Sequence, residues 1–305
     1  MCIDFLGEKL LQRTMKMNKI LIIGKNSYIG CSFKKWMEKY EKTVKVECIS
    51  SRNHDWEKVD FGKYDTILHV AGIAHVNASA DREEEYYKVN RDLTISCCKK
   101  AKEDGAKQFI FLSSIIVFGE SKSLKPIRIT KNTQPSPNGF YGKSKLEAEQ
   151  GILPMATDTF RVAVVRPPMV YGKGSKGNYA RLSKLAKKLS VFPKYSNQRS
   201  MIHIDILCEC LRLIIENQAE GIFCPQNREY VTTSEMIKEI GFCYGRNVYL
   251  VPFLGGMIKI AAKFVPLLNK VFGSLTYEKS LSNCFGGAYQ ILDFKETIQR
   301  TEEKG

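Results

Sequence analysis

Tyr141 and Lys145 are four residues apart in the segment FYGKSK, and Ser114 precedes the tyrosine by 27 positions. On a helix, this spacing places both side chains on one face. A phenol is a poor base because its ordinary pKa is about 10, and a neighbouring ammonium lowers that pKa. With a serine hydroxyl beside them, these groups predict proton transfer at an alcohol while a redox cofactor exchanges the hydride. The spacing alone is weak, because Tyr and Lys also meet in this way on solvated helix faces.

A second candidate site is the turn from Gly24 to Gly30, GKNSYIG, which follows an apolar run and precedes a helical pattern. Glycines in such a turn let the backbone approach a pyrophosphate that sits at the helix N-terminus. Ser27 stands where a middle glycine is usual, and a tight turn without a ligand is the alternative. The position between strand and helix favours dinucleotide binding.

The next apolar run ends in ISSRN at residues 49–53, where an acid would hold the adenosine ribose of NAD. No acid is present in this segment, and Arg52 with Ser51 could instead bind the 2′-phosphate of NADP. An exposed surface arginine with NAD still bound explains the residue equally well. Both cofactors therefore remain open at this point.

The elements that must position these residues are five apolar runs that alternate with helical patterns, which predicts a parallel sheet built from βαβ units. The runs are apolar almost throughout, as strands buried on both faces should be. The expected strands are Lys19–Ile23, Val44–Ile49, Thr66–Val70, Gln108–Leu112 and Arg161–Val165. The expected helices lie near Ile29–Tyr40, Glu85–Glu103 and Gly139–Gly151.

The composition limits the class of protein. The chain has 305 residues, 44% of them hydrophobic, and no uninterrupted apolar run approaches a membrane span. The ten cysteines and four histidines form no paired motif, so we expect no metal site and reduced thiols in a cytoplasmic protein. The net charge of +15 is spread along the chain, so an anionic small substrate or a lysine-rich proteome explains it better than nucleic acid does.

Together with further motifs, these residues resemble the extended short-chain dehydrogenase/reductases, specifically the NAD-dependent epimerase/dehydratase family that includes UDP-glucose 4-epimerases. The similarity extends from about Lys19 to about Glu302. The motifs are HVAG at 69–72, YKVN at 87–90, FLSSIIVFG at 111–119, YGKSK at 141–145, RPPMVYG at 166–172 and RSMIHID at 199–205. No single motif is decisive, but their order and spacing together are specific.

The resemblance implies roles for individual residues. Tyr141 matches the acid/base, Ser114 the catalytic serine, and Lys145 the lysine that lowers the pKa of the tyrosine and holds the nicotinamide ribose. Substrate contacts are expected from His75, Ser114, Asn178 and Arg199, the last because a guanidinium forks onto diphosphate oxygens. The implied cofactor-binding residues are Gly24, Ser27, Tyr28, Ile29, Gly30, Arg52, Asp60, Ala71, Gly72, Asn90, Tyr141, Lys145 and Pro168.

Two of these assignments have a plain structural alternative. Asn90 could simply satisfy backbone groups at a helix bend. His75 lies in an expected loop, where a histidine is more often incidental than a substrate contact. Asp60 matches an adenine contact by the resemblance alone.

The resemblance also implies the architecture: an α/β fold with a Rossmann-type doubly wound parallel sheet and a smaller C-terminal substrate-binding domain. Residues 17–170 would form the NAD(P)-binding domain, with return segments near 200–225, and residues 171–305 mainly the substrate-binding domain. Residues 1–16 are interpreted as an N-terminal extension, either disordered or a misassigned start. In the second half, a basic helix is expected at Tyr179–Leu189 and another from the capping box at Thr232 to near Gly241.

Within the family, the residues after Ser114 separate the reactions. Sugar 4,6-dehydratases carry an Asp-Glu pair there, whereas this chain has Ile115 and Ile116, which disfavours dehydration. We therefore expect a 4-epimerase of UDP-glucose or UDP-N-acetylglucosamine with bound NAD, serving surface polysaccharide biosynthesis. One alternative is an NAD(P)H-dependent 4-keto reductase of a UDP-6-deoxy-N-acetylhexosamine. An alternative of another class is a non-catalytic dinucleotide-binding sensor.

Two further expectations concern partners. By analogy with the family, the helices around Tyr87–Glu103 and Tyr141–Gln150 pair across a two-fold axis and form a homodimer. The segment Ile258–Val271 carries Lys259, Lys263 and Lys270 among apolar residues. Core packing of the smaller domain is the simpler interpretation of this segment, and peripheral contact with anionic lipid is the alternative.

Overall fold

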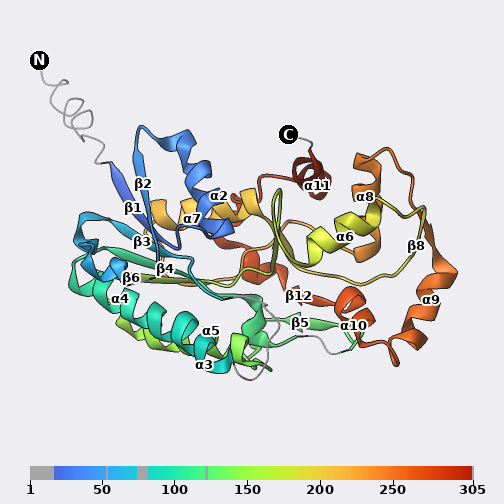
Figure 1. The fold of residues 1–305 in the computed structure, drawn as a ribbon, viewed down its shortest axis with the longest axis horizontal. Helices are drawn as coiled ribbons and strands as arrows, with labels where there is room; N and C mark the ends of the chain where they lie inside the picture. The colour runs from blue at the N-terminus through green and yellow to red at the C-terminus, as the bar shows by residue number, and fades with distance from the viewer. Residues whose placement is uncertain (1–16, 53, 74–81, 121–122, 304–305) are drawn as a thin grey trace, which may run out of the picture.

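A computed structural model describes residues 17–52, 54–73, 82–120 and 123–303 (Figure 1). Its centre is a six-stranded sheet with all neighbours parallel, in the order β10-β6-β4-β3-β1-β2. The strands are β1 (Asn18–Ile23), β2 (Val44–Ile49), β3 (Thr66–His69), β4 (Gln108–Leu112), β6 (Arg161–Val165) and β10 (Gly221–Phe223). This is the α/β, Rossmann-type sheet that the sequence predicts.

The alternation of side chains along β1 supplies two hydrophobic cores, one on each face of the sheet. Ile20 and Ile22 face one core, and Leu21 and Ile23 face the other. Successive side chains of a strand point to opposite faces, so a continuously apolar strand must be covered on both sides. Helices α2 (Tyr28–Met37) and α7 (Ile204–Glu216) pack together on the first face, and α4 (Leu93–Glu103) packs beside α5 (Phe140–Ile152) on the second.

Most predicted elements are present with small shifts of their ends. Three expected strands have their predicted bounds, β1 begins one residue earlier and β3 ends one residue earlier. The strand β10 was not predicted, because its three residues are too few to make a periodic pattern. The helix expected at Glu85–Glu103 is divided into α3 (Glu83–Tyr86), a π-helical stretch (Tyr87–Asp92) and α4.

The second half of the chain builds a smaller unit with its own hydrophobic core, to the right in Figure 1. Its helices are α6 (Asn178–Ala186), α8 (Thr233–Cys243), α9 (Pro252–Ala261), α10 (Pro266–Phe272) and α11 (Phe294–Glu302). Outside the central sheet, the strands form three parallel pairs: β5 (Ile127–Ile129) with β12 (Leu275–Tyr277), β7 (Met169–Tyr171) with β9 (Met201–His203), and β8 (Val191–Pro193) with β11 (Tyr249–Val251). The strand β5 comes from the first half of the chain. As predicted, the Thr232 side chain caps α8 by accepting from the Glu235 N–H.

Candidate active site

The predicted site residues follow the carboxyl ends of the central strands. Gly24 follows β1, Gly72 follows β3, Ser114 follows β4, and Pro168 follows β6. In the sheet, β1 lies between β2 and β3, so the strand order reverses direction there. In open α/β sheets, ligands bind at the carboxyl edge beside such a reversal.

The turn between β1 and α2 packs closely against the loop after β3. Gly24 has φ +123°, and a β-carbon there would lie 3.0 Å from the backbone nitrogen of Ala71. Ser27, which replaces the middle glycine, caps α2 by accepting from the N–H of Gly30. The first turn of α2 carries no acidic side chain. Its positive end therefore suits a diphosphate, and the residues present fit a dinucleotide.

The other side of this turn is closed by the smaller unit. Tyr28 and Ile29 open α2 and are partly buried against the first core. A β-carbon on Gly172, which has φ +150°, would lie 2.8 Å from the Tyr28 hydroxyl. The loop after β7 therefore lies directly against the proposed cofactor turn, and glycine at position 172 permits this contact.

Arg52 and Asp60 lie in the segment that connects β2 to β3. Arg52 is exposed, and its backbone N–H donates to the Ser50 hydroxyl over 3.1 Å. Asp60 caps a short 3₁₀ helix by accepting from the N–H of Gly62 over 2.9 Å. The capping bond gives Asp60 a structural task, and contacts of Arg52 and Asp60 with a cofactor stay predictions.

The fold brings Ser114, Tyr141 and Lys145 together. Ser114 caps the 3₁₀ turn after β4 in an extended conformation, and its hydroxyl is hydrogen-bonded to the Tyr141 side chain. Tyr141 and Lys145 occupy the same face of α5, as their spacing predicts. The Lys145 ammonium donates to the carbonyl of Leu112 over 2.8 Å.

Burial dominates the electrostatics of Tyr141 and Lys145. Burial raises the pKa of Tyr141 to about 12, and the bond to Ser114 opposes that rise. Burial lowers the pKa of Lys145 to about 7, while the Glu149 carboxylate opposes the change. Desolvation acts on both groups and favours their neutral forms, and the lowering of the tyrosine pKa by a charged Lys145 stays a prediction.

Gly72 and Asn90 define the space around the lysine. A β-carbon on Gly72 would lie 3.0 Å from both the Lys145 Nζ and the Asn90 Oδ1. Asn90 is buried in the π-helical stretch, where its amide accepts from the Ile73 N–H and donates to the Ile73 carbonyl and to Ser144 Oγ. Its side chain thus satisfies backbone groups, which is the structural alternative, and it does so beside the candidate catalytic lysine.

Sequence reasoning missed a buried ion pair behind Lys145. Glu149, one turn further along α5, accepts from Ser113 Oγ and binds Arg166 with N–O distances of 2.5–3.1 Å. Glu149 is 1% exposed and Arg166 is 7% exposed. The spacing from Lys145 could have placed Glu149 on the same helix face. Nothing in the local sequence indicates its partner from the loop after β6.

The residues expected to contact the substrate lie on separate elements, unlike Ser114, Tyr141 and Lys145. Asn178 is exposed at the start of α6, after Gly177 with φ +100°. Arg199 donates through Nε to the Gly273 carbonyl over 3.0 Å and through Nη2 to the Lys270 carbonyl, so it caps the end of α10. Roles of both residues in substrate binding stay predictions, and His75 lies outside the described residues.

Pro168 is buried where the chain leaves β6. The N–H of Ile115 donates to the carbonyl of Pro167 over 3.0 Å, which fixes this loop beside the turn that carries Ser114. The loop that carries Pro168 therefore lies beside the turn that carries Ser114, and contact of Pro168 with a cofactor stays a prediction. Ala71 is buried after β3, at the backbone contact with Gly24 described above.

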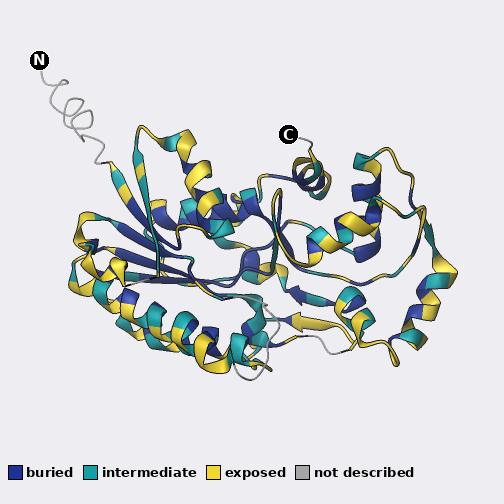
Figure 2. Ribbon diagram, in the orientation of Figure 1, coloured by how far each residue is buried: buried dark blue, intermediate teal, exposed yellow. Residues whose placement is uncertain are grey.

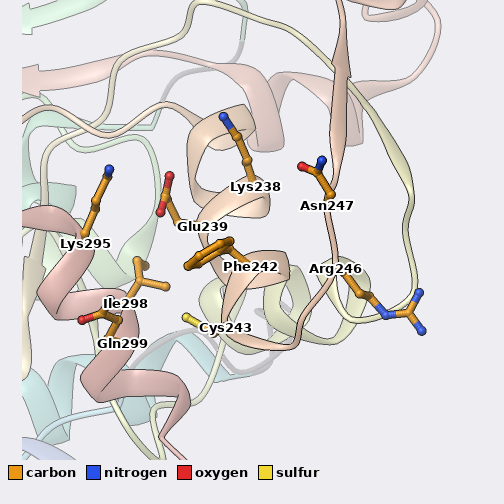
Figure 3. A pocket seen from close by; sticks show the side chains of 9 residues that line it. All are labelled: Lys238, Glu239, Phe242, Cys243, Arg246, Asn247, Lys295, Ile298 and Gln299. Atoms are coloured by element: carbon orange, nitrogen blue, oxygen red, sulfur yellow. The ribbon is translucent and has the colours of Figure 1, made fainter.

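A surface hollow lies elsewhere, between α8 and α11 (Figure 3). It is lined by Phe242 and Lys238 from α8 and by Lys295 from α11, among others, and the predicted catalytic residues do not line it. Within residues 17–52, 54–73, 82–120 and 123–303, no cluster of three His, Cys, Asp or Glu side chains could hold a metal ion. No helix of this described part is long and apolar enough to cross a membrane.

Comparison with known proteins finds relatives over most of the chain. The sequence model of the NAD dependent epimerase/dehydratase family matches residues 5–224. A UDP-glucose 4-epimerase of Vibrio cholerae is 32% identical over 246 residues, which are 76% of this chain and 70% of that protein. An N-acetyl-alpha-D-glucosaminyl-diphospho-ditrans,octacis-undecaprenol 4-epimerase of Escherichia coli O157:H7 is 28% identical over 141 residues, 45% of this chain and 41% of that protein.

Solved structures have the same fold at low sequence identity. The dTDP-4-dehydrorhamnose reductase from Bacillus anthracis in complex with NADP superposes with a TM-score of 0.71 at 17% identity. The superposition covers 93% of this chain and 98% of that one.

Proposed function

We propose, from the premise that this chain belongs to the NAD-dependent epimerase/dehydratase family, that it is a nucleotide-sugar 4-epimerase. The expected substrate is UDP-glucose or UDP-N-acetylglucosamine, and the expected destination of the product is a surface polysaccharide. The observation that carries the proposal is the hydrogen-bonded pair Ser114 and Tyr141, with Lys145 one turn along α5, at the sheet edge that also holds the glycine turn.

In this proposal, each residue has a defined task. Tyr141 accepts the proton of the C4 hydroxyl, directly or through Ser114, and later returns a proton to the same oxygen. The chemistry that NAD supplies when bound is reversible acceptance of hydride from C4. Lys145, with a pKa of about 7, is poised to change its charge near neutral pH. An ammonium at Lys145 would favour the phenolate of Tyr141, so gaining that charge would activate the base.

The residues after Ser114 support epimerisation over dehydration. Ile115 and Ile116 form the 3₁₀ turn that Ser114 caps, in the place where a dehydratase carries an acid and a base. Neither aliphatic side chain can transfer a proton. The reaction we propose is therefore confined to hydride and proton exchange at one carbon.

A 4-keto reductase is the second candidate, and Arg52 is the observation that favours it. This arginine is exposed after β2, in a segment without the acid that typically selects NAD. An NADP preference would suit a reductase that consumes its cofactor. The shared fold with a dTDP-4-dehydrorhamnose reductase is compatible with either reaction.

The test is incubation of purified protein with UDP-N-acetylglucosamine and with UDP-glucose without added reductant, followed by proton NMR. An epimerase produces the galacto isomer, and Tyr141→Phe abolishes turnover while dinucleotide binding is retained. Tyr64→Phe is the matched control, because the Tyr64 hydroxyl donates to Glu47, away from the site. N-acetylglucosaminyl diphosphoundecaprenol is added as a third substrate, because the E. coli relative is named for this lipid-linked sugar.

Absence of an isomer from all three substrates, with cofactor shown to be bound, would contradict the epimerase. Oxidation of NADPH by a 4-keto sugar nucleotide would then support the reductase. If neither reaction occurs and Tyr141→Phe leaves cellular function unchanged, a non-catalytic dinucleotide sensor becomes the better proposal.

A further inference from the structure

Helix α9 presents apolar side chains on two opposite faces, although a surface helix normally has one. Its inner face is formed by Gly255 and Ile258, which are buried, and Ile258 belongs to the core of the smaller unit. A β-carbon on Gly255 would collide with the carbonyl of Lys194, so the helix backbone touches the segment after β8. Core packing, the simpler interpretation from sequence, therefore accounts for the inner face alone.

The outer face of α9 and α10 consists of Phe253, Met257, Ile260, Phe264 and Leu267. The first four recur at intervals of four, three and four residues, which places them on one stripe of a helix and the turn after it. Phe253 is 76% exposed and Phe264 is 80% exposed. Large apolar side chains gathered in this way mark an interaction surface rather than scattered surface residues.

The outer face stands at one end of the molecule. In Figure 1, α9 and α10 lie at the opposite end of the long axis from β1, β2 and α4, and Figure 2 shows much of α9 exposed. Helices α4 and α5, which we expect to pair in a homodimer, lie on the large sheet and not at this end. That dimer would therefore leave the outer face open.

The charge of this region points to one kind of partner. Between Glu239 and Glu278 the chain contains no Asp or Glu, but it contains Arg246, Lys259, Lys263 and Lys270. The three lysines are exposed: Lys259 lies on α9, Lys263 in the turn after it and Lys270 on α10. Protein interface cores are depleted in lysine, whereas lysines beside an exposed apolar stripe are typical of helices that lie on anionic lipid.

We propose that the outer face docks on an anionic lipid bilayer, with Phe253, Phe264 and their apolar neighbours at the boundary of headgroups and acyl chains. Lys259, Lys263 and Lys270 then face the lipid phosphates. Both helices are too short to span a bilayer, so the contact is peripheral and reversible. The proposal does not depend on the reaction that the site performs.

The first test is co-sedimentation of the full chain with vesicles of phosphatidylcholine, with or without 30% phosphatidylglycerol. We expect binding to the anionic vesicles that weakens at high salt. Lys259→Gln with Lys263→Gln should reduce the association constant about 25-fold, because each lysine near an anionic surface contributes about fivefold. Phe253→Ser with Phe264→Ser should reduce it at least about tenfold, because buried apolar area is lost.

The matched control is Phe242→Ser on α8, because Phe242 is 72% exposed in the hollow of Figure 3 and lies outside the outer face. It should leave vesicle binding unchanged. Equal binding to both vesicle types, no binding to either, or an equal loss in the Phe242 variant would each overturn the proposal. Concentration-dependent self-association without vesicle binding would assign the outer face to a second copy of the chain and also overturn it.

A second measurement does not rely on loss of binding. Phe264→Trp keeps an aromatic side chain at an exposed position, so the fold is expected to tolerate it. Its fluorescence should shift to shorter wavelength on anionic vesicles and be quenched by lipids with brominated acyl chains, whereas Phe242→Trp should show neither change. Absence of quenching in the Phe264 variant would overturn the proposal even if vesicle binding were observed.

Discussion

Helix α5 carries two Glu–Arg ion pairs, two residues apart, in opposite environments. Glu149 pairs with Arg166 in the interior, where both side chains are less than a tenth exposed. Glu147 pairs with Arg91 at the surface over 2.9 Å, with side chains 41% and 35% exposed. Glu149→Gln and Glu147→Gln therefore remove the same charge from the same helix, and the two variants differ in how deeply the ion pair is buried.

The expected magnitudes follow from desolvation. Removing one partner of a buried pair leaves the other charge uncompensated and costs about 3–5 kcal/mol, here from the guanidinium of Arg166. The surface pair contributes about 0–1 kcal/mol, because water screens it. Arg91 also keeps Asp92 as a partner over 2.6 Å, which reduces the loss further. We therefore expect Glu149→Gln to lower the free energy of unfolding by several times as much as Glu147→Gln.

The assay is unfolding in urea, followed by the fluorescence of Trp36 and Trp56. These side chains pack in the two cores on either face of the central sheet. The double variant Glu149→Leu with Arg166→Met should be more stable than Glu149→Gln, because apolar residues of similar volume replace a buried pair at little cost. Equal losses for the two single Gln variants would refute the reasoning. A double variant less stable than Glu149→Gln would show that the network stabilises through more than charge compensation.

Three further predictions concern the site and its supports. Gly72→Ala should lower the free energy of unfolding in urea by about 1–3 kcal/mol, because the added methyl group overpacks the space beside Lys145 and Asn90. An unchanged free energy of unfolding would contradict this. Burial lowers the pKa of His69 to about 3, so the unfolded state binds more protons and stability falls as pH drops from about 6.5 to 3. In the His69→Gln variant, the midpoint of urea unfolding should decrease less over this pH range than in the original protein. The pKa of Lys145 is lowered to about 7 by burial, so unfolding free energy should rise from pH 7 to about 10.5, and Lys145→Met should abolish this rise.

Much of the fold could be predicted because its signals are local. Val44–Ile49, Gln108–Leu112 and Arg161–Val165 form strands with the predicted bounds, since each is a short run in which apolar residues predominate. The π-helical stretch Tyr87–Asp92 could not be predicted, because it depends on how the Asn90 side chain binds the backbone of Ile73. A local pattern contains no information about a partner that the fold supplies.

For the candidate catalytic groups, local sequence predicts where the side chains lie but not which charge they carry. The four-residue spacing suffices to place Tyr141 and Lys145 on one face of α5, because helix geometry decides it. Their pKa values depend on what buries them: the Lys145 ammonium meets the carbonyl of Leu112, 33 residues away, and lies near Asn90 and Gly72. Burial is the largest cause of the raised pKa of Tyr141, and the helix spacing gives no information about burial. A positive charge on Lys145 would favour the phenolate form of Tyr141. An interaction that raises the pKa of Lys145 would therefore also lower the pKa of Tyr141, so that the lysine becomes charged as the tyrosine becomes a stronger acid.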